Sequence, residues 1–356
     1  MSLFSFKDVC QDVTKTATKI PTSEYLEEGK YEIFDQGKSF VAGYTNNSIG
    51  IANEFPYIVF GDHTRAIKYV DVPCFIGADG VKLLKVNNSN FDSKYVYYTL
   101  LNFPIMSQGY SRHFKYLKEC VFVERSLEEQ NRIVSELDKI QSAIDNKRQQ
   151  LAKLDELVNS KFYEMFECKN YPISTIGECC TLKSGTTFKK ELELESGDYM
   201  YIKVSDMNLP ENEKYIRTSK TYVSSSSIKN FAIPGNSIIF PKRGGAIATN
   251  KKRITQNTIC VDLNTMAVTP NSTLNLDYLY QFFVNIDMGK LYNGAAVPQI
   301  NNKDIAPLKI SIPPLELQEQ FANFAQKIEQ AKDVVSKQIN NLQELLDSRM
   351  DFYFRQ

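Results

Sequence analysis

Residues 133–165 read IVSELDKIQSAIDNKRQQLAKLDELVNSKFYEM, and the order of apolar residues in this stretch decides the fold. Apolar side chains recur alternately three and four positions apart, which keeps one stripe of a helix facing a partner. The stretch contains neither Gly nor Pro, and Glu, Lys, Gln and Asp fill its other faces. It therefore predicts one helix of about 40 residues, or about 60 Å at 1.5 Å per residue.

The same pattern occurs again near the C-terminus. Placing Ser126-Leu127-Glu128-Glu129-Gln130 over Pro314-Leu315-Glu316-Leu317-Gln318 fixes an offset of 188 residues, which holds without a gap from Lys115/Lys303 to Phe166/Phe354. Fourteen of the 52 pairs are identical where chance predicts about three, so the chain contains an internal duplication. Helices this long cannot cover their apolar stripes alone, and we expect them to pack as an antiparallel coiled coil. The residues predicted to form this packing are Ile133, Leu137, Ile140, Ile144, Leu151, Leu154, Val158, Phe321, Ile328, Val335, Ile339, Leu342 and Leu346.

Two longer segments separate the helices and read as globular domains. Residues 1–122 and 169–312 hold almost all the glycine, with short strand-like runs such as 57–60 and 237–240 between turn signals. The predicted fold class is therefore α+β, with two mixed domains, two long helices and a pseudo-twofold internal repeat. The predicted boundaries are 1–122 for the first domain, 123–168 for the first helix, 169–312 for the second domain and 313–356 for the second helix.

Composition excludes several classes of protein. The chain has 356 residues, 42% of them hydrophobic, and no run approaches the ~18 consecutive apolar residues of a membrane span. Its seven cysteines are an odd number without a C-x-x-C pair, which argues against a disulfide framework and against a zinc site. We therefore expect reduced thiols, a cytoplasmic location and no membrane partner.

No motif in the chain points convincingly to catalysis. The glycine patterns of phosphate-binding loops are absent, and the two histidines, His63 and His113, lie in no metal-ligand spacing. Asp12 with Glu28-Gly29-Lys30 loosely matches a metal-dependent nuclease site, but the same residues also suit a solvated turn. We therefore expect no catalytic, cofactor-binding or metal-binding residues in this chain.

Basic and polar loops suggest recognition of DNA instead. The net charge is zero, but residues 240–253 carry five positive charges and no acid, and they predict a basic hairpin around Gly244-Gly245. Residues 61–68 are a less basic counterpart, and polar loops at 107–115 and 293–303 precede the two long helices. Gln, Asn, Arg and His can contact base edges. The residues predicted to contact DNA are His63, Arg65, Lys68, Arg112, His113, Lys115, Lys203, Lys242, Arg243, Lys251, Lys252, Arg253 and Gln299.

Taken together, these features resemble the specificity subunits of type I restriction-modification systems over essentially the whole chain. Residues 19–25 and 31–45 look like one variety of that family's target recognition domain. Residues 184–187, 201–207 and 298–301 look like another. The helix starts Leu127-Glu128-Glu129-Gln130 and Ile312-Pro313-Pro314-Leu315-Glu316-Leu317-Gln318 are similar to its central and distal conserved regions, although Val123-Glu124-Arg125-Ser126 lacks the usual Pro-Pro.

The resemblance implies a non-catalytic subunit that binds double-stranded DNA. Each domain would read one half of a bipartite site, and the helix pair would set the spacer between the halves. The implied partners are two adenine methyltransferase subunits and two restriction subunits, which would carry S-adenosylmethionine, ATP and Mg²⁺, so no cofactor is expected in this chain. Two alternatives remain open: an interaction scaffold that does not bind DNA, and a metal-dependent endonuclease.

Overall fold

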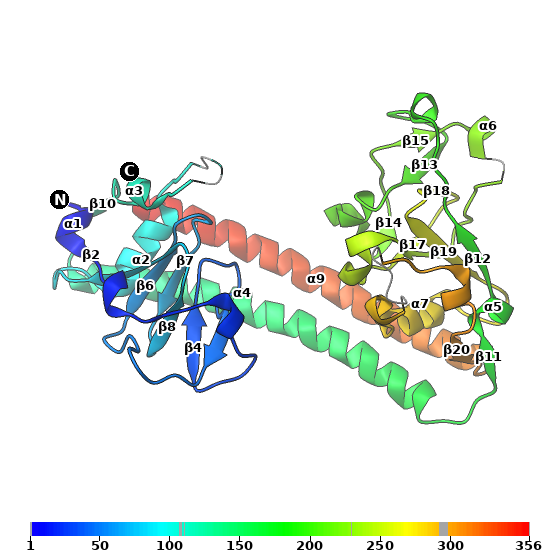
Figure 1. The fold of residues 1–356 in the computed structure, drawn as a ribbon, viewed down its shortest axis with the longest axis horizontal. Coiled ribbons are helices and arrows are strands. Elements are labelled where there is room, and N and C mark those ends of the chain that lie inside the picture. The colour runs from blue at the N-terminus through cyan, green and yellow to red at the C-terminus, as the bar shows by residue number, and fades with distance from the viewer. Residues whose placement is uncertain (1, 107–108, 110, 229, 292–297, 356) are drawn as a thin grey trace. The chain divides into compact units, whose positions relative to one another are not determined.

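The computed structural model describes residues 2–106, 109, 111–228, 230–291 and 298–355. It divides into two compact units (Figure 1). Unit 1 comprises Met1–Arg148 and Ser336–Gln356, and unit 2 comprises Gln149–Val335. Each unit therefore contains one of the two globular domains together with a part of each long helix.

Unit 1 is built around two four-stranded sheets. The first, β2-β9-β6-β7, is antiparallel throughout. The second, β3-β8-β4-β5, is mixed because β8 runs parallel to both β3 and β4. A short ribbon pairs β1 (Leu3–Ser5) with β10 (Val121–Val123). The remaining elements are β2 (Cys10–Asp12), β3 (Lys19–Ile20), β4 (Tyr31–Phe34), β5 (Gly43–Thr45), β6 (Tyr57–Gly61), β7 (Ile67–Val70), β8 (Cys74–Gly77), β9 (Val81–Val86), α1 (Phe6–Val9), α2 (Ser93–Asn102) and α3 (Phe114–Leu117), with 3₁₀ turns η1 (Thr14–Thr16) and η2 (Thr22–Glu24).

Strand β6 lies at the centre of unit 1 and is buried along its whole length. Its alternate side chains point to opposite faces. Ile58 and Phe60 join the core that contains α2 and the long helices, whereas Val59 packs with Phe34 and Ile76 of the second sheet. Burial on both faces explains why the strand is an unbroken apolar run instead of an alternating one.

Unit 2 repeats this plan with its strands divided differently between the sheets. A five-stranded sheet, β12-β19-β16-β17-β14, and a three-stranded sheet, β15-β13-β18, accompany a ribbon of β11 and β20. Strand β16 corresponds to β6, because Ile238 and Phe240 face the helices while Ile239 packs with Ile202 and Val261. The elements are β11 (Ile173–Thr175), β12 (Cys180–Ser184), β13 (Tyr199–Ile202), β14 (Tyr215–Ile216), β15 (Tyr222–Val223), β16 (Ile238–Pro241), β17 (Arg253–Thr255), β18 (Cys260–Val261), β19 (Thr265–Pro270), β20 (Lys309–Ser311), α5 (Ile176–Cys179), α6 (Ser225–Ile228), α7 (Leu276–Val284) and α8 (Asn302–Ile305), with 3₁₀ turns η4 (Lys190–Leu192), η5 (Asp206–Asn208), η6 (Pro210–Asn212), η7 (Gly244–Thr249) and η8 (Met288–Lys290).

The two long helices are α4 (Leu127–Phe162, 36 residues) and α9 (Leu315–Phe354, 40 residues). A π-helical turn, η3 (Tyr163–Glu167), extends α4. Unit 1 packs the start of α4 against the end of α9, with Ile133 and Leu137 in one core with Leu346 and Met350. Unit 2 packs the end of α4 against the start of α9. All thirteen predicted packing residues are buried or half-buried, so the predicted antiparallel pair is confirmed.

A buried glutamine at the start of each long helix explains the repeated sequence motif. Gln130 donates from Nε2 to the carbonyls of Asn90 and Arg125, and its Oε1 accepts from the backbone N–H of Asp92. Gln318 makes the equivalent three bonds, to Thr273 O, Pro313 O and the N–H of Asn275. Both side chains are fully buried, and an amide in that position stabilises the fold only when its polar atoms are bonded. Each glutamine therefore ties a long helix to the capping residue of α2 or α7.

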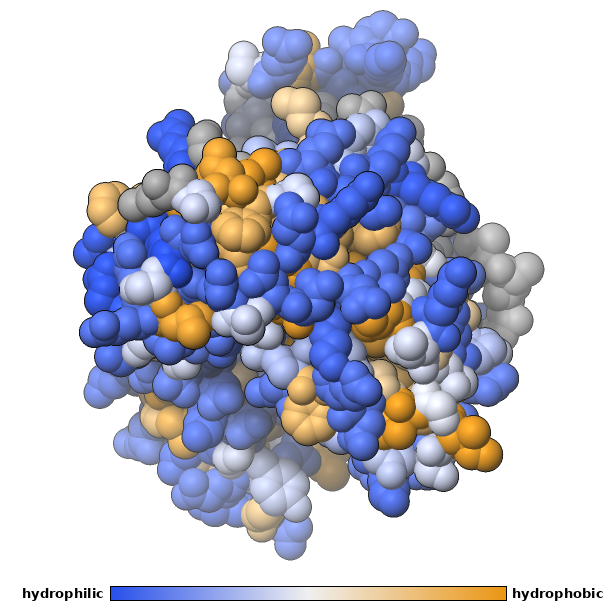
Figure 2. All heavy atoms as spheres, turned by 90° about the vertical axis from the view of Figure 1, so that its left-hand side faces the viewer, coloured by the Kyte–Doolittle hydropathy of each residue, from blue (hydrophilic) through white to orange (hydrophobic). Residues whose placement is uncertain are grey.

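The surface of unit 1 on the side where both chain termini lie is mostly hydrophilic. Figure 2 shows this face, where apolar side chains form small patches separated by polar ones. The exposed apolar residues of unit 1 include Leu3, Leu127 and Phe352. Over the described part of the chain, no helix is both long and apolar enough to cross a bilayer.

Candidate nucleic-acid interface

Three loops of unit 1 meet at the turn between β6 and β7. They follow β4 (residues 35–40), follow β6 (62–66) and precede α3 (103–113, of which 107, 108 and 110 lie outside the described residues). Thr64 Oγ1 donates to Gln36 O at 2.5 Å, and Arg65 Nη1 donates to Ile105 O at 2.9 Å. His63 Nδ1 lies 3.3 Å from Ser111 O. These bonds join the three loops into one surface.

Arg65 is an exposed, strong hydrogen-bond donor at the centre of this surface. Its φ is +64°, a left-handed conformation that L side chains adopt at a cost. The side chain is exposed, and the bond to Ile105 O uses only one of its five N–H donors. Arg112 and Lys115 are also exposed, whereas His63 is half-buried. Unit 1 therefore offers two arginines and a lysine to an anionic ligand.

Lys68 and His113 do not reach the surface of unit 1. The alternation of β7 turns Lys68 inward, where it is 5% exposed and its Nζ donates to Ser39 O at 2.6 Å and lies 3.7 Å from Asp35 Oδ1. Burial lowers its pKa, an effect that Asp35 opposes. His113 is 1% exposed, with Nδ1 3.0 Å from Asp62 O. Both side chains therefore brace the loops from inside, and neither lies on the exposed surface that the three loops form.

Unit 2 has three loops in the same places. They follow β13 (203–208), follow β16 (242–252) and precede α8 (298–301). Arg243 and Gln299 form a backbone bridge, and the Gly244 N–H donates to Pro298 O at 2.8 Å. Lys251 Nζ donates to Asn208 Oδ1. The second half of the chain thus repeats the three-loop arrangement of the first.

The connection between β16 and β17 differs from the predicted hairpin. The strands pair antiparallel, with Ile238 opposite Ile254, as a hairpin requires. However, the 3₁₀ helix η7 and Asn250 at φ +53° replace a tight Gly-Gly turn. Ile247 within η7 is 1% exposed, so one apolar anchor folds the loop back onto the domain.

Lys242 and Lys252 are braces inside this loop and not parts of its surface. Lys242 is 6% exposed and donates to Ser184 Oγ at 2.8 Å. Lys252 is 4% exposed and donates at 2.7 Å to both Asn250 Oδ1 and Ile286 O. Burial lowers the pKa of Lys252 to about 8, partly opposed by Asp287, and burial together with Arg243 lowers the pKa of Lys242. Both ammonium groups are therefore occupied by partners inside the domain and do not lie on the loop's exposed surface.

The remaining predicted residues of unit 2 are half-buried. They differ in how many of their N–H groups already donate hydrogen bonds within the domain. Arg253 donates to Lys252 O and Met207 O, and Lys203 pairs with Glu193 at 2.7 Å. The Nε atoms of Arg243 and Arg253 are both buried without a hydrogen-bond partner among the described residues, but Arg253 already uses two other N–H donors within the domain. A guanidinium with an unsatisfied N–H is suited to a ligand that supplies the missing acceptor. Arg243 and Gln299 are therefore the strongest candidates in this unit.

Sequence reasoning missed residues that organise the loops. Gln36 joins two loops of unit 1 through its carbonyl and its side chain, with Oε1 accepting weakly from the His63 N–H at 3.4 Å. Ser184 and Asn250 hold the two buried lysines of unit 2. The turn-like sequence Asp35-Gln36-Gly37 is a local signal that could have identified Gln36. No local pattern identifies Ser184 or Asn250.

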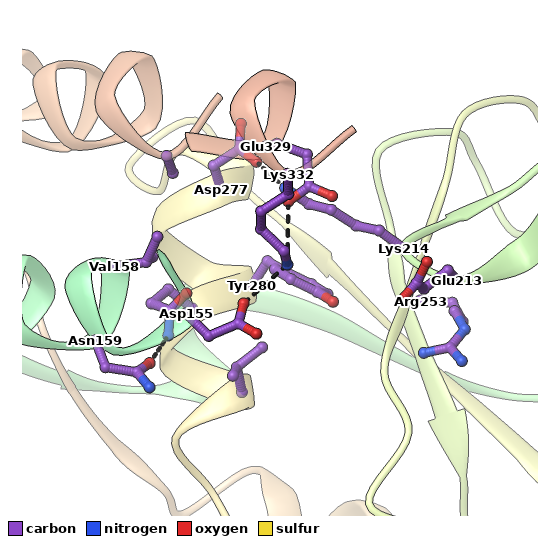
Figure 3. Close-up of a pocket in the computed structure, with 13 residues that line it drawn as sticks. Asp155, Val158, Asn159, Glu213, Lys214, Arg253, Asp277, Tyr280, Glu329 and Lys332 are labelled. Atoms are coloured by element: carbon purple, nitrogen blue, oxygen red, sulfur yellow. Dashed lines mark hydrogen bonds and ion pairs between the residues drawn. The ribbon is translucent and has the colours of Figure 1, made fainter. Parts of the chain in front are cut away.

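A cavity of about 370 Å³ in unit 2 is lined by charges of both signs (Figure 3). Lys332 pairs with Asp155 at 2.8 Å, and Lys214 lies 3.7 Å from both Asp277 and Glu329. These contacts link α4, α7, α9 and the loop before β14. The cavity is therefore lined by ion pairs that join the domain to the helices.

In the described part of the chain, the fold forms neither a metal-ligand cluster nor a reactive pair of thiols. Among the described residues, no three His, Cys, Asp or Glu side chains gather as metal ligands would. Asp12 accepts from Thr14, and Glu28 and Lys30 are exposed. All seven cysteines are free thiols and only Cys168 is exposed. Burial raises the pKa of Cys74 and Cys120 to about 12, so these two thiols stay protonated and unreactive at neutral pH.

Comparisons with known proteins agree with one another. The family model described as "Type I restriction modification DNA specificity domain" matches residues 169–344. The chain is 24% identical to the type I restriction enzyme EcoR124I/EcoR124II specificity subunit of Escherichia coli, over 94% of this chain and 88% of that protein. Its fold is similar to that of the type I restriction-modification S subunit from M. genitalium, with TM-score 0.55, 16% identity and coverage of 98% and 94%. It is also similar to a chain in a structure of type I R-M complex assembly, with TM-score 0.59, 13% identity and coverage of 99% and 97%.

Proposed function

The chain belongs to the DNA specificity subunits of type I restriction-modification systems, and we propose that each of its two domains reads one half of a split DNA site. The observation that carries this proposal is the three-loop surface, which occurs once in each unit. Unit 1 places Arg65 and Arg112 on loops supported by buried strands, and unit 2 places Arg243 and Gln299 on such loops. Arginine reads guanine through O6 and N7, and amides read adenine.

The two surfaces are built differently, which supports two different half-sites. Unit 1 exposes Arg65, Arg112 and Lys115, whereas unit 2 presents Arg243 and Lys251 from a longer loop after β16 and Gln299 from the loop before α8. Braces in the interior hold each set: Lys68 and His113 in unit 1, and Lys242 and Lys252 in unit 2. Reading residues on braced loops reach DNA in a fixed geometry, and a fixed geometry is what sequence selection requires.

The long helices act as a spacer in this proposal. Helices of 36 and 40 residues without interruption span about 54 and 60 Å at 1.5 Å per residue. One turn of B-DNA is roughly 34 Å, so rods of this length suit half-sites separated by unread base pairs. The number of heptads in the pair would then set the number of unread base pairs.

The chemistry of the system resides in partner subunits. The chain is a non-catalytic component of the type I complex. We infer that two methyltransferase subunits, carrying S-adenosylmethionine, methylate an adenine in each half-site, and that two restriction subunits use ATP and Mg²⁺ for cleavage. This chain would select the DNA sequence at which both reactions take place.

Binding of the assembled methyltransferase complex to a randomised duplex library tests the proposal. We expect enrichment of a two-part sequence with a constant gap, and an affinity that falls steeply between 50 and 200 mM salt, as roughly six to ten phosphate contacts would require. A protein scaffold with no DNA role would instead show no enrichment and no salt dependence.

A further inference from the structure

A pair of opposed residues lies where two of the three loops of unit 2 meet. Arg243 and Gln299 face each other in an isolated antiparallel bridge between the loop after β16 and the loop before α8. The two hydrogen bonds that close the bridge join the neighbours of this pair: the Gly244 N–H with Pro298 O at 2.8 Å, and the Ile300 N–H with Lys242 O at 2.9 Å. Arg243 and Gln299 therefore occupy a non-hydrogen-bonded position, where opposed side chains leave the same face and the Cα atoms are roughly 4.5 Å apart.

The amide of Gln299 is oriented by its own loop. Its Nε2 donates to Asn301 Oδ1 at 2.6 Å. Asn301 is held in turn by a capping box at the start of α8, where Asp304 accepts from the Asn301 N–H at 2.8 Å. An amide has two N–H groups and one oxygen, so the bond to Asn301 leaves one N–H and the oxygen. These are the two groups that an amide needs to bind adenine at N7 and N6.

The guanidinium of Arg243 is available to a ligand in a way that the nearby Arg253 is not. Arg253 turns both Nη atoms into the domain, where they donate to backbone carbonyls. Arg243 makes no such bond to the described residues, and its Nε is buried without a partner among them. A guanidinium fork with two parallel N–H groups binds guanine at O6 and N7. Arg243 therefore has the donors for a guanine, and Gln299 beside it has the groups for an adenine.

The backbone next to this pair leaves room for a base edge. Gly244 and Gly245 follow Arg243, and a Cβ added at either glycine would meet no described atom within 4 Å. Gly244 also has a φ of +66°, a conformation that glycine adopts without steric cost. A stretch of backbone without side chains allows close approach of a ligand.

We propose that Arg243 and Gln299 act together and read a guanine and an adenine on adjacent base pairs in the half-site of unit 2. The inference rests on the proposed function, since it names the bases that this unit selects. Neighbouring base pairs of a duplex are about 3.4 Å apart, which is close to the separation of opposed residues in the bridge. Because the bridge fixes the two residues relative to each other, their contacts form in one register on neighbouring bases.

Unit 1 carries a different pair at the same two positions. The His113 N–H donates to Asp62 O at 2.8 Å, which corresponds to the second of the two bonds that close the bridge in unit 2. His63 follows Asp62 and Arg112 precedes His113, so these two residues take the places of the proposed reading pair. An arginine in the place of the glutamine favours guanine where unit 2 selects adenine. The two half-sites should therefore differ at this step.

Duplexes with 7-deaza bases test the proposal on the chain assembled with the methyltransferase subunit of its own system. Selection from a randomised duplex library first identifies the half-sites. A 7-deaza base pairs normally but lacks the N7 acceptor. At the proposed step, 7-deazaguanine should weaken wild-type binding by about 5- to 100-fold and leave the affinity of Arg243→Ala unchanged. The same substitution at the adenine should weaken wild-type binding and leave the affinity of Gln299→Ala unchanged.

Substitutions that exchange one hydrogen-bonding pattern for another test whether the two bases are neighbours. Arg243→Gln should change the preferred guanine to adenine, and Gln299→Glu should change the preferred adenine to cytosine. The two changes should fall on adjacent base pairs of the same half-site. Arg217→Gln is the matched control, because Arg217 is an exposed arginine of unit 2 outside the three loops, and it should leave the selected sequence unchanged.

Three results would overturn the proposal. These are half-sites that contain no guanine beside an adenine, wild-type binding that does not respond to 7-deaza bases at this step, and changed preferences on base pairs that are not neighbours. The first two use wild-type protein, so they decide the question even where a variant does not fold. A wild-type complex that selects no sequence at all would contradict the proposed function instead.

Discussion

Arg65 combines a left-handed backbone conformation with an exposed guanidinium. The backbone conformation lowers the stability of the fold, whereas the guanidinium is proposed to bind DNA. Glycine adopts a positive φ without steric cost. We expect Arg65→Gly to leave the free energy of unfolding unchanged or raise it by up to about 1 kcal/mol, while DNA affinity falls by about 1 to 3 kcal/mol. Urea unfolding and fluorescence anisotropy with a duplex measure the two effects.

Asn236 provides the matched control for Arg65. It also has a positive φ, of 60°, but it precedes β16 and so lies at the end of that strand away from the loops. Asn236→Gly should affect stability similarly and leave DNA binding alone. Equal loss of DNA affinity in both variants would remove Arg65 from the interface.

Lys252 makes the stability of unit 2 depend on pH in a defined direction. Its pKa is about 8 in the folded chain and 10.5 without burial, so between these values the unfolded chain binds more protons. Stability then rises with pH over this window, because the buried charge is removed in the folded state first. From pH 7 to pH 10 the wild type should gain roughly 2 kcal/mol relative to Lys252→Met, at about 1.4 kcal/mol per pKa unit. If the free energy of unfolding changed with pH equally in the wild type and in Lys252→Met, the pKa of Lys252 would not be lowered by burial.

Burial of individual basic residues was the least predictable feature at this scale. Residues 240–253 have the composition of a solvated basic hairpin, yet two of the lysines point inward. Two of the atoms that accept hydrogen bonds from these lysines, Ile286 O and Ser184 Oγ, are remote in sequence. A charge pattern shows how many cations a loop has, but tertiary partners decide which of them face solvent.

At the scale of elements, the long helices were predictable because their signal is repeated at every turn. Of the ten positions in the apolar stripe of each helix, eight carry apolar side chains, and charged interruptions such as Lys147 do not change the period. The strands were predicted as short runs, but their pairing was not, since the parallel pairing of β8 with β4 joins segments about 40 residues apart. The prediction of a tight hairpin turn after β16 was wrong, because the buried side chain of Ile247, and not the glycine pair, determines the path of the loop.

The glutamine at the start of each long helix allows a direct test of how the elements are joined. Gln318→Ala removes the partners of two carbonyls and one N–H in a site without solvent, and it leaves a small cavity. We expect a loss of about 2 to 4 kcal/mol in the free energy of unfolding of unit 2, and the same for unit 1 with Gln130→Ala. The exposed Gln149→Ala should change it by less than about 0.5 kcal/mol. Unfolding curves that match the wild type for Gln130→Ala and Gln318→Ala would contradict this role.

At the scale of the whole molecule, each unit is completed by the far end of a helix that starts in the other half of the sequence. Tyr95 of unit 1 packs on Phe354 of α9 at 5.3 Å between ring centroids, and Tyr278 of unit 2 packs on Phe166 after α4 at 4.7 Å. The duplication predicted two similar halves, and this exchange of helix ends follows from the antiparallel pairing. The order of segments along the chain did not show it.

Removal of Ser336–Gln356 tests this exchange. The deletion takes Leu346, Met350, Tyr353 and Phe354 from the core of unit 1, although that unit begins at the opposite end of the chain. We expect amide protection in unit 1 to be lost while β16 and β19 of unit 2 stay protected in hydrogen exchange. Loss of protection confined to α9 itself would mean that unit 1 is stable without the helix end.

The central claim is that two separate surfaces read two halves of one DNA site. Mapping of methylated adenines in cells that carry either the wild-type chain or Arg243→Ala tests it most directly. The wild type should give one two-part sequence with a constant gap, and the variant should relax preference in one half only, with the other half and the gap unchanged. A single uninterrupted sequence, or a change in both halves at once, would contradict the account.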